Sequence, residues 1–192
     1  NPAQIASAAN LRTDIINSLS EYASNVEINK FGGRFKYSKL NTLIDRVDNG
    51  ITSNITKVII RRDMKALLNQ FAQYELCFGN RFNINPAGYN IKSTGFTING
   101  FTETAYLTDV PNKDASGNLD TSMKGTLSVV LKNNKGQQVV LIKDAGVVDY
   151  KKGEVILNTV NITSTSAQNN IIEVQAFPES NDVVGLKDLY LS

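Results

Sequence analysis

A change of pattern near Asn49-Gly50 limits the folds open to this 192-residue chain more than any other feature. Before it, apolar residues recur every three or four positions, first over Ile5–Val26 and again over Leu40–Val47, which is the spacing of one helix face. Ser38 is a favoured residue type for capping the second helix. Gly50 suits its end, because glycine accepts the left-handed conformation common there. From Ile51 onward the pattern is that of strands.

The middle of the chain carries two strand signals and one irregular stretch. Ile55–Arg62 is rich in β-branched residues, and Tyr74–Ile84 is rich in aromatic and apolar ones. Ala87–Asn118 mixes aromatic side chains with Gly, Asn and Thr, which indicates short strands joined by long loops.

The last third carries two hairpin signals. Thr126–Lys132 and Gln138–Lys143 flank a turn that ends in Gly136, and a second, tighter turn closes at Gly153. We predict a positive φ at Gly153. Replacing it with valine is then expected to cost about 1–2 kcal/mol, because β-branched residues tolerate that region poorly.

These patterns predict the α+β class, with two N-terminal helices followed by a mostly antiparallel β-sheet region with long loops. Three parts are expected: a helical part at residues 1–50, mixed strands with long and protruding loops at 51–125, and an antiparallel β part at 126–192. The chain begins without methionine and stops within an apolar segment. We therefore expect a fragment of a larger protein.

The residue types present argue against an enzyme. The chain has no histidine, so the commonest general base and zinc ligand are missing. Its one cysteine, Cys77, lies between Leu76 and Phe78 and is interpreted as a buried strand thiol. Ser38 precedes a lysine, but helix capping explains that serine. We predict no catalytic residue, no metal site and no cofactor.

Charged groups give no ligand site either. Asp109, Asp114 and Asp120 are expected in one solvated loop, and the stretch from Asp114 to Asp120 lacks both the glycine at the sixth position and the closing glutamate of a calcium loop. The net charge is +2, and the cluster at Lys57–Lys65 alternates with apolar residues, so nucleic acid is not expected as a partner. No apolar run reaches the roughly 18 residues of a membrane helix, so no membrane partner is predicted either.

Two ordered stretches resemble a known family. The first runs from Tyr37-Ser38-Lys39-Leu40 through Asp48-Asn49-Gly50 to Val58, and the second is Val147-Val148-Asp149-Tyr150 followed by Gly153 and Val155. Their order resembles the baseplate J-like proteins of contractile phage tails. The resemblance is closest to the C-terminal part of the baseplate wedge proteins of T-even-type phages.

The resemblance implies a structural protein of a contractile tail baseplate. Copies would associate with one another and join other baseplate wedge proteins into a ring around the hub. The implied location is the tail baseplate of the virion, after assembly in the host cytoplasm. The alternative is a receptor- or glycan-binding module of a tail fibre or adhesin, in which aromatic residues such as Tyr89 among Asn and Thr stack on sugars.

The irregular stretch also supplies candidate interface residues. Phe96, Phe101 and Tyr106 are large enough to anchor a protein interface, which tends to be built on aromatic side chains. The competing interpretation is a local core under a long loop. In that case the N-terminal helix or the apolar tail Val183–Leu191 becomes the expected interface.

Overall fold

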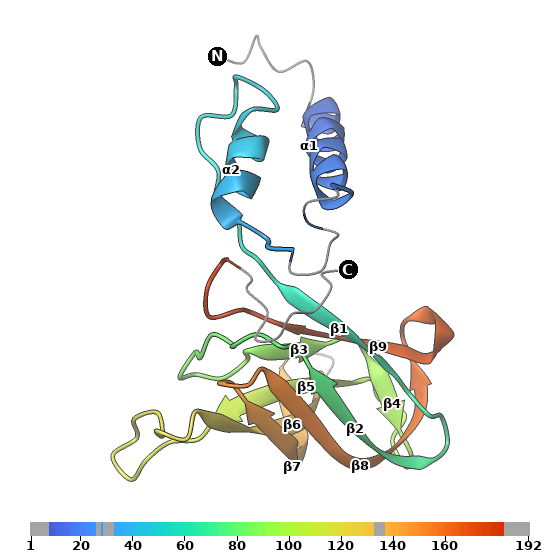
Figure 1. Ribbon diagram of the computed structural model, residues 1–192. Coiled ribbons are helices and arrows are strands. Elements are labelled where there is room, and N and C mark those ends of the chain that lie inside the picture. The colour runs from blue at the N-terminus through green and yellow to red at the C-terminus, as the bar shows by residue number, and fades with distance from the viewer. Residues whose placement is uncertain (1–7, 26–27, 29–32, 133–136, 183–192) are drawn as a thin grey trace. The chain divides into compact units, whose positions relative to one another are not determined.

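The computed structural model describes residues 8–25, 28, 33–132 and 137–182 (Figure 1). Two units divide the chain. The described residues up to 58, together with 180–182, form the helical unit, and Ile59–Glu179 form the β unit. These boundaries differ from the three parts expected from the sequence, because the strands before and after residue 125 belong to one unit. Gly136 and the tail Val183–Leu191 lie outside the described residues.

The helical unit contains α1 (Ala8–Ala23) and α2 (Tyr37–Asp45). Lys36 is the residue before the first turn of α2 and makes no side-chain cap, so Ser38 lies inside the helix and does not cap it. Tyr22 is the one buried residue of these two helices. Its ring centroid lies 6.5 Å from that of Phe35 and 5.4 Å from the Lys39 Nζ.

The β unit is built on a closed barrel. Its strand order is β8-β4-β5-β6-β7, and β7 pairs back onto β8, so five strands form a ring, with β2 added to β8. All of these pairings are antiparallel. The strands are β2 (Phe71–Cys77), β4 (Phe96–Ile98), β5 (Ala105–Pro111), β6 (Lys124–Lys132), β7 (Gln138–Asp149) and β8 (Glu154–Thr165).

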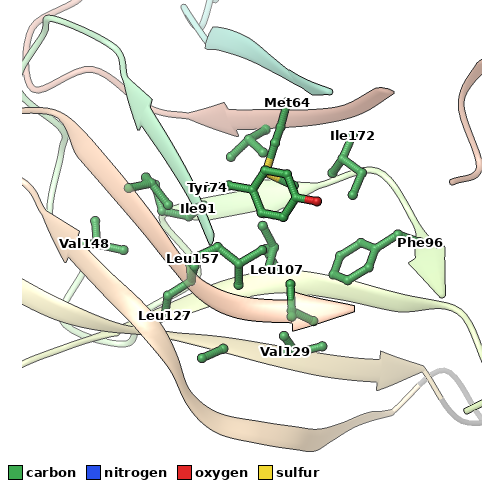
Figure 2. Packing of buried hydrophobic residues seen from close by; sticks show 14 of the residues in the cluster. Met64, Tyr74, Ile91, Phe96, Leu107, Leu127, Val129, Val148, Leu157 and Ile172 are labelled. Carbon is green, nitrogen blue, oxygen red and sulfur yellow. The ribbon is translucent and has the colours of Figure 1, made fainter. Parts of the chain in front are cut away.

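A three-stranded antiparallel sheet lies against the barrel. Its order is β1 (Ile60–Lys65), β9 (Ile171–Ala176) and β3 (Ile91–Ser93), and the short 3-10 helix Gln168–Asn170 leads into β9. Met64 and Ile172 of this sheet point toward Leu107 and Leu157 of the barrel (Figure 2). Barrel and sheet therefore share one apolar core, drawn from strands and the loops between them.

The predicted α+β class is wrong, because the chain is mostly β, with α-helices only near its N-terminal end among the described residues. The sequence interpretation underestimated the strands of Ala87–Asn118, where β3, β4 and β5 complete the sheet and the barrel. These strands are short, and glycines with positive φ at 88 and 100 interrupt the apolar pattern that would reveal them.

Two residues of the β unit lie in different environments from those expected. Cys77 is exposed, because Tyr74 and Leu76 turn inward on β2 and the alternate residues turn outward. Asp109 is not in a loop: it lies within β5 and is 1% exposed. No described helix is both long and apolar enough to cross a membrane.

Candidate assembly surface

The three predicted interface residues lie in three different environments. Phe96, on β4, is 1% exposed and belongs to the core, so its side chain has no surface left for a partner. Phe101 follows β4 and is 44% exposed. Tyr106, on β5, is half-buried, with the Lys132 Nζ 5.0 Å from its ring centroid. The structure therefore does not bring the three rings together on one face.

The predicted turn glycines have clear local roles where they are described. The Gly50 N–H donates to the Asp48 Oδ1 at 2.6 Å, just after α2. Gly153 has φ +70° in the β7–β8 turn, where its N–H donates to the Asp149 carbonyl at 2.9 Å. The Gly153 carbonyl accepts from the Phe78 N–H at 2.8 Å, which attaches this turn to the end of β2.

A buried polar cluster centres on Asp109. Its carboxylate accepts three hydrogen bonds: from the Tyr150 Oη at 2.5 Å, the Asn90 Nδ2 at 2.8 Å and the Ile91 N–H at 2.6 Å. Tyr150 is fully buried and Asn90 is 4% exposed. A buried carboxylate is stable only when its oxygens are well satisfied, and these donors come from two separate segments, Asn90-Ile91 and Tyr150. The cluster therefore fixes the segment before β3 to the barrel.

The loop from Asn85 to Asn90 is held by further hydrogen bonds. The Asn85 N–H donates to the Asn90 Oδ1 at 2.6 Å, and the Tyr89 N–H donates to the Asp109 carbonyl at 3.1 Å. Gly88 has φ +86°, and a Cβ there would lie 2.5 Å from the Asp109 carbonyl oxygen. The loop approaches β5 so closely that only glycine fits at this position.

Tyr89 has an unusual backbone for an aromatic residue. Its φ is +64°, in the left-handed region where a side chain costs about 1–2 kcal/mol. Its side chain is nevertheless 51% exposed. The neighbouring hydrogen bonds at Asn85, Asn90 and Asp109 hold this conformation. The fold thus presents an aromatic side chain at the surface from a fixed, strained position.

An apolar row crosses the outer face of the barrel beside Tyr89. Strand register places Val110 opposite Thr126, Thr126 opposite Val147, and Val147 opposite Ile156. The residues next to them, among them Leu127, Val148 and Leu157, point into the core (Figure 2). Because strand residues alternate, the row faces outward, and Val110 and Val147 are 51% and 44% exposed.

Among the described residues, one group has the donor types of a metal site. Glu75, Cys77 and Glu154 place one ligand atom each within 4.8 Å of one another on the outer face of β2 and β8. Glu75 and Cys77 are exposed, and the Lys152 Nζ lies 3.6 Å from the Glu154 Oε2. An ammonium already neutralises part of this group, so we assign it no function.

Residues 3–63 match the family model described as baseplate structural protein gp6, C-terminal domain III. The match supports a structural component of a phage tail baseplate, of the wedge type, that contacts other baseplate proteins. It also supports a location in the tail baseplate of the virion, and a baseplate structural family suggests a non-enzyme. The matched range contains α1 and α2 and ends within β1. A search of the curated proteins found no match.

Stability at alkaline pH tests the buried cluster. Burial raises the pKa of Tyr150 far above its ordinary value of about 10, and the charge of Asp109 and the hydrogen bond to it raise it further. Above about pH 10 the unfolded chain releases this proton and the folded chain keeps it. The contribution of Tyr150 to stability is therefore complete below pH 10 and is lost as the pH rises further.

Urea denaturation from pH 8.5 to 11 measures this dependence. The Tyr150→Phe variant is the control, because it lacks the titrating hydroxyl while the other tyrosines titrate as before. We expect the difference in unfolding free energy between the two proteins to shrink above about pH 10. A constant difference across the range would contradict the assignment.

Proposed function

We propose that the chain is a structural component of a contractile phage tail baseplate that associates with itself and joins wedge subunits into a ring around the hub. In this proposal it belongs to the baseplate J-like proteins and is assembled in the host cytoplasm. The observation that carries it is the family match over residues 3–63, which includes both helices of the helical unit and ends within β1. Its partners are other copies and other baseplate wedge proteins, without nucleic acid, membrane, metal or cofactor.

The packing of the two helices supports an assembly role. Helices of 16 and 9 residues gain little stability alone, so they depend on burial of their apolar faces. Yet Tyr22 is their one buried residue, and Ile16 of α1 is 50% exposed. Leu43 and Val47 line an open hollow of about 370 Å³ together with Asp14, Glu21 and Arg46. The rest of this hollow is lined by polar and charged residues. Exposed apolar side chains such as Ile16 favour association with another protein.

Light scattering after size-exclusion chromatography tests this proposal. The chain is expected to elute as more than one copy, or to form a complex with other wedge proteins. Ile16→Asp should weaken association about tenfold or more, because a charge would enter the contact. Ile55→Asp is the matched control, since Ile55 lies in the same unit and is 91% exposed. A chain that stays monomeric at all concentrations and binds no wedge protein would sink the proposal.

Two exposed aromatic side chains still support the alternative, which is a receptor- or glycan-binding module. Tyr89 and Phe101 are 51% and 44% exposed, whereas Phe96 is in the core and Tyr106 is half-buried. A glycan array separates this alternative from assembly. Sugar binding that is lost in Tyr89→Gly, by a chain that does not associate, would favour it.

A further inference from the structure

We propose that the outer face of the barrel is a second protein contact, in which the patch around Tyr89 binds the same patch of a second copy of this chain. The barrel patch consists of Tyr89, Val110, Thr126, Val147 and Ile156. This inference rests on the proposed assembly function and deepens it, because it names a surface outside the helical unit and the partner that covers it.

The barrel patch is apolar and uncharged across four strands. Neighbouring strands lie about 4.8 Å apart, so the row from Val110 to Ile156 spans about 15 Å. The backbone of Tyr89 adjoins its β5 end, where the Tyr89 N–H donates to the Asp109 carbonyl at 3.1 Å. Tyr89, Val110 and Val147 are each between 44% and 51% exposed. The row is therefore continuous in the sheet and faces outward, with Thr126 between Val110 and Val147.

Tyr89 has the properties of an interface anchor. Aromatic residues held in one position before binding lose little conformational entropy on association, and interface hot spots are rich in tyrosine. Here the positive φ of Tyr89 is fixed by Gly88, Asn90 and the Asp109 carboxylate below them. Residues held in strained conformations cluster at functional positions, and the ring of Tyr89 is half exposed. Binding of a partner to the exposed ring would account for a tyrosine held in this conformation at the surface.

The charges beside the barrel patch favour a second copy as the occupant. The next outward positions on β6, β7 and β8 are Lys124, Asp149 and Glu154, which are neighbours by strand register. The Lys152 Nζ lies 3.6 Å from the Glu154 Oε2, and Glu75 on β2 lies opposite Ile156, so this border carries two lysines and three carboxylates. A border that carries both signs can complement itself, because a two-fold axis can place each lysine opposite a carboxylate.

The size of the barrel patch sets the expected strength of the contact. A stable interface buries about 800 Å² on each partner, and a patch about 15 Å wide falls below that. The contact is therefore expected to be weak alone and to act together with a contact of the helical unit, which raises the effective concentration of one patch near another.

Tyr89→Gly is the sharpest test, because glycine removes the ring and accepts the positive φ. We expect this variant to unfold at the same temperature as the parent or higher, while self-association measured by sedimentation velocity weakens about tenfold. Val147→Lys should weaken association similarly, by placing a charge in an apolar part of the contact. Phe71→Ser is the matched control, since this aromatic side chain is 74% exposed on β2 and lies outside the patch.

The same measurements in the Ile16→Asp background separate the two contacts. Residual association that is lost on adding Tyr89→Gly supports the barrel patch. Association that Ile16→Asp abolishes and Tyr89→Gly leaves unchanged overturns this inference and leaves the proposed function standing. Loss of binding to another wedge protein without loss of self-association overturns the choice of occupant. A chain that neither self-associates nor binds a wedge protein overturns both proposals.

Discussion

Asp109→Ala is expected to lower the free energy of unfolding by about 3–5 kcal/mol, because it leaves three buried donors without an acceptor. Each such donor costs about 1–3 kcal/mol when it loses its partner away from water. The donors are the hydroxyl of Tyr150, the amide of Asn90 and the N–H of Ile91. Urea denaturation followed by circular dichroism measures the loss.

Asp114→Ala is the matched control for this prediction. The Asp114 carboxylate also accepts hydrogen bonds, from the N–H groups of Ser116 and Asn118, both at 2.9 Å, but it lies in an exposed turn. Water can replace a lost acceptor there, so a loss of about 1 kcal/mol or less is expected. Equal losses in the two variants would show that the Asp109 cluster gains nothing from its burial.

Gly153→Val is the second substitution with a large expected effect. The sequence alone predicts about 1–2 kcal/mol from the positive φ. The structure raises this to about 3–5 kcal/mol, because a Cβ at Gly153 would overlap the carbonyl oxygen of Asn80, and backbone atoms cannot move aside as a flexible side chain can. The β7–β8 turn would have to move away from the segment after β2.

Gly100→Val isolates the cost of the backbone conformation from that of the overlap. Gly100 has φ +88°, but a Cβ there meets no atom within 4 Å. The free energy of unfolding of this variant should fall by only about 1–2 kcal/mol, which is the cost of the left-handed conformation for a residue with a side chain. Denaturation midpoints of the two variants give the difference directly. The overlap at Asn80 would be refuted by equal losses.

The two helices could be predicted from the sequence because their apolar residues recur with a helical period. The stripe over Ile5–Val26 contains α1, and the one over Leu40–Val47 overlaps α2, because a helix face depends only on residues three or four apart. The barrel could not be predicted in this way. Its ring includes the pairing of β4 with β8, such as Phe96 with Thr165, and no local pattern encodes these partners.

Single residues beside the barrel patch show the same limit. From the sequence, Asp109 is expected in one solvated loop with Asp114 and Asp120, whereas Ala105, Leu107 and Asp109 alternate inward along β5. Applying that alternation to Ala105–Pro111 would have placed the carboxylate in the core. The exposure of Tyr89 could be guessed from its polar neighbours. Its left-handed backbone could not, because that depends on contacts with β5.

The pairing of β1 with β9 determines how the β unit responds to mechanical load. Ile60, at the start of β1, lies opposite Ala176, at the end of β9, so the chain enters and leaves this unit side by side. The chain that leaves β9 is also attached to the segment after β2, since the Asn83 N–H donates to the Phe177 carbonyl and the Glu179 N–H donates to the Arg81 carbonyl, both at 2.9 Å. Tension applied through the flanking segments therefore acts on β1 at one side and on these hydrogen bonds at the other. β1 is an edge strand, whereas β9 lies between β1 and β3, so β1 is the strand that can separate first, one hydrogen-bonded step at a time.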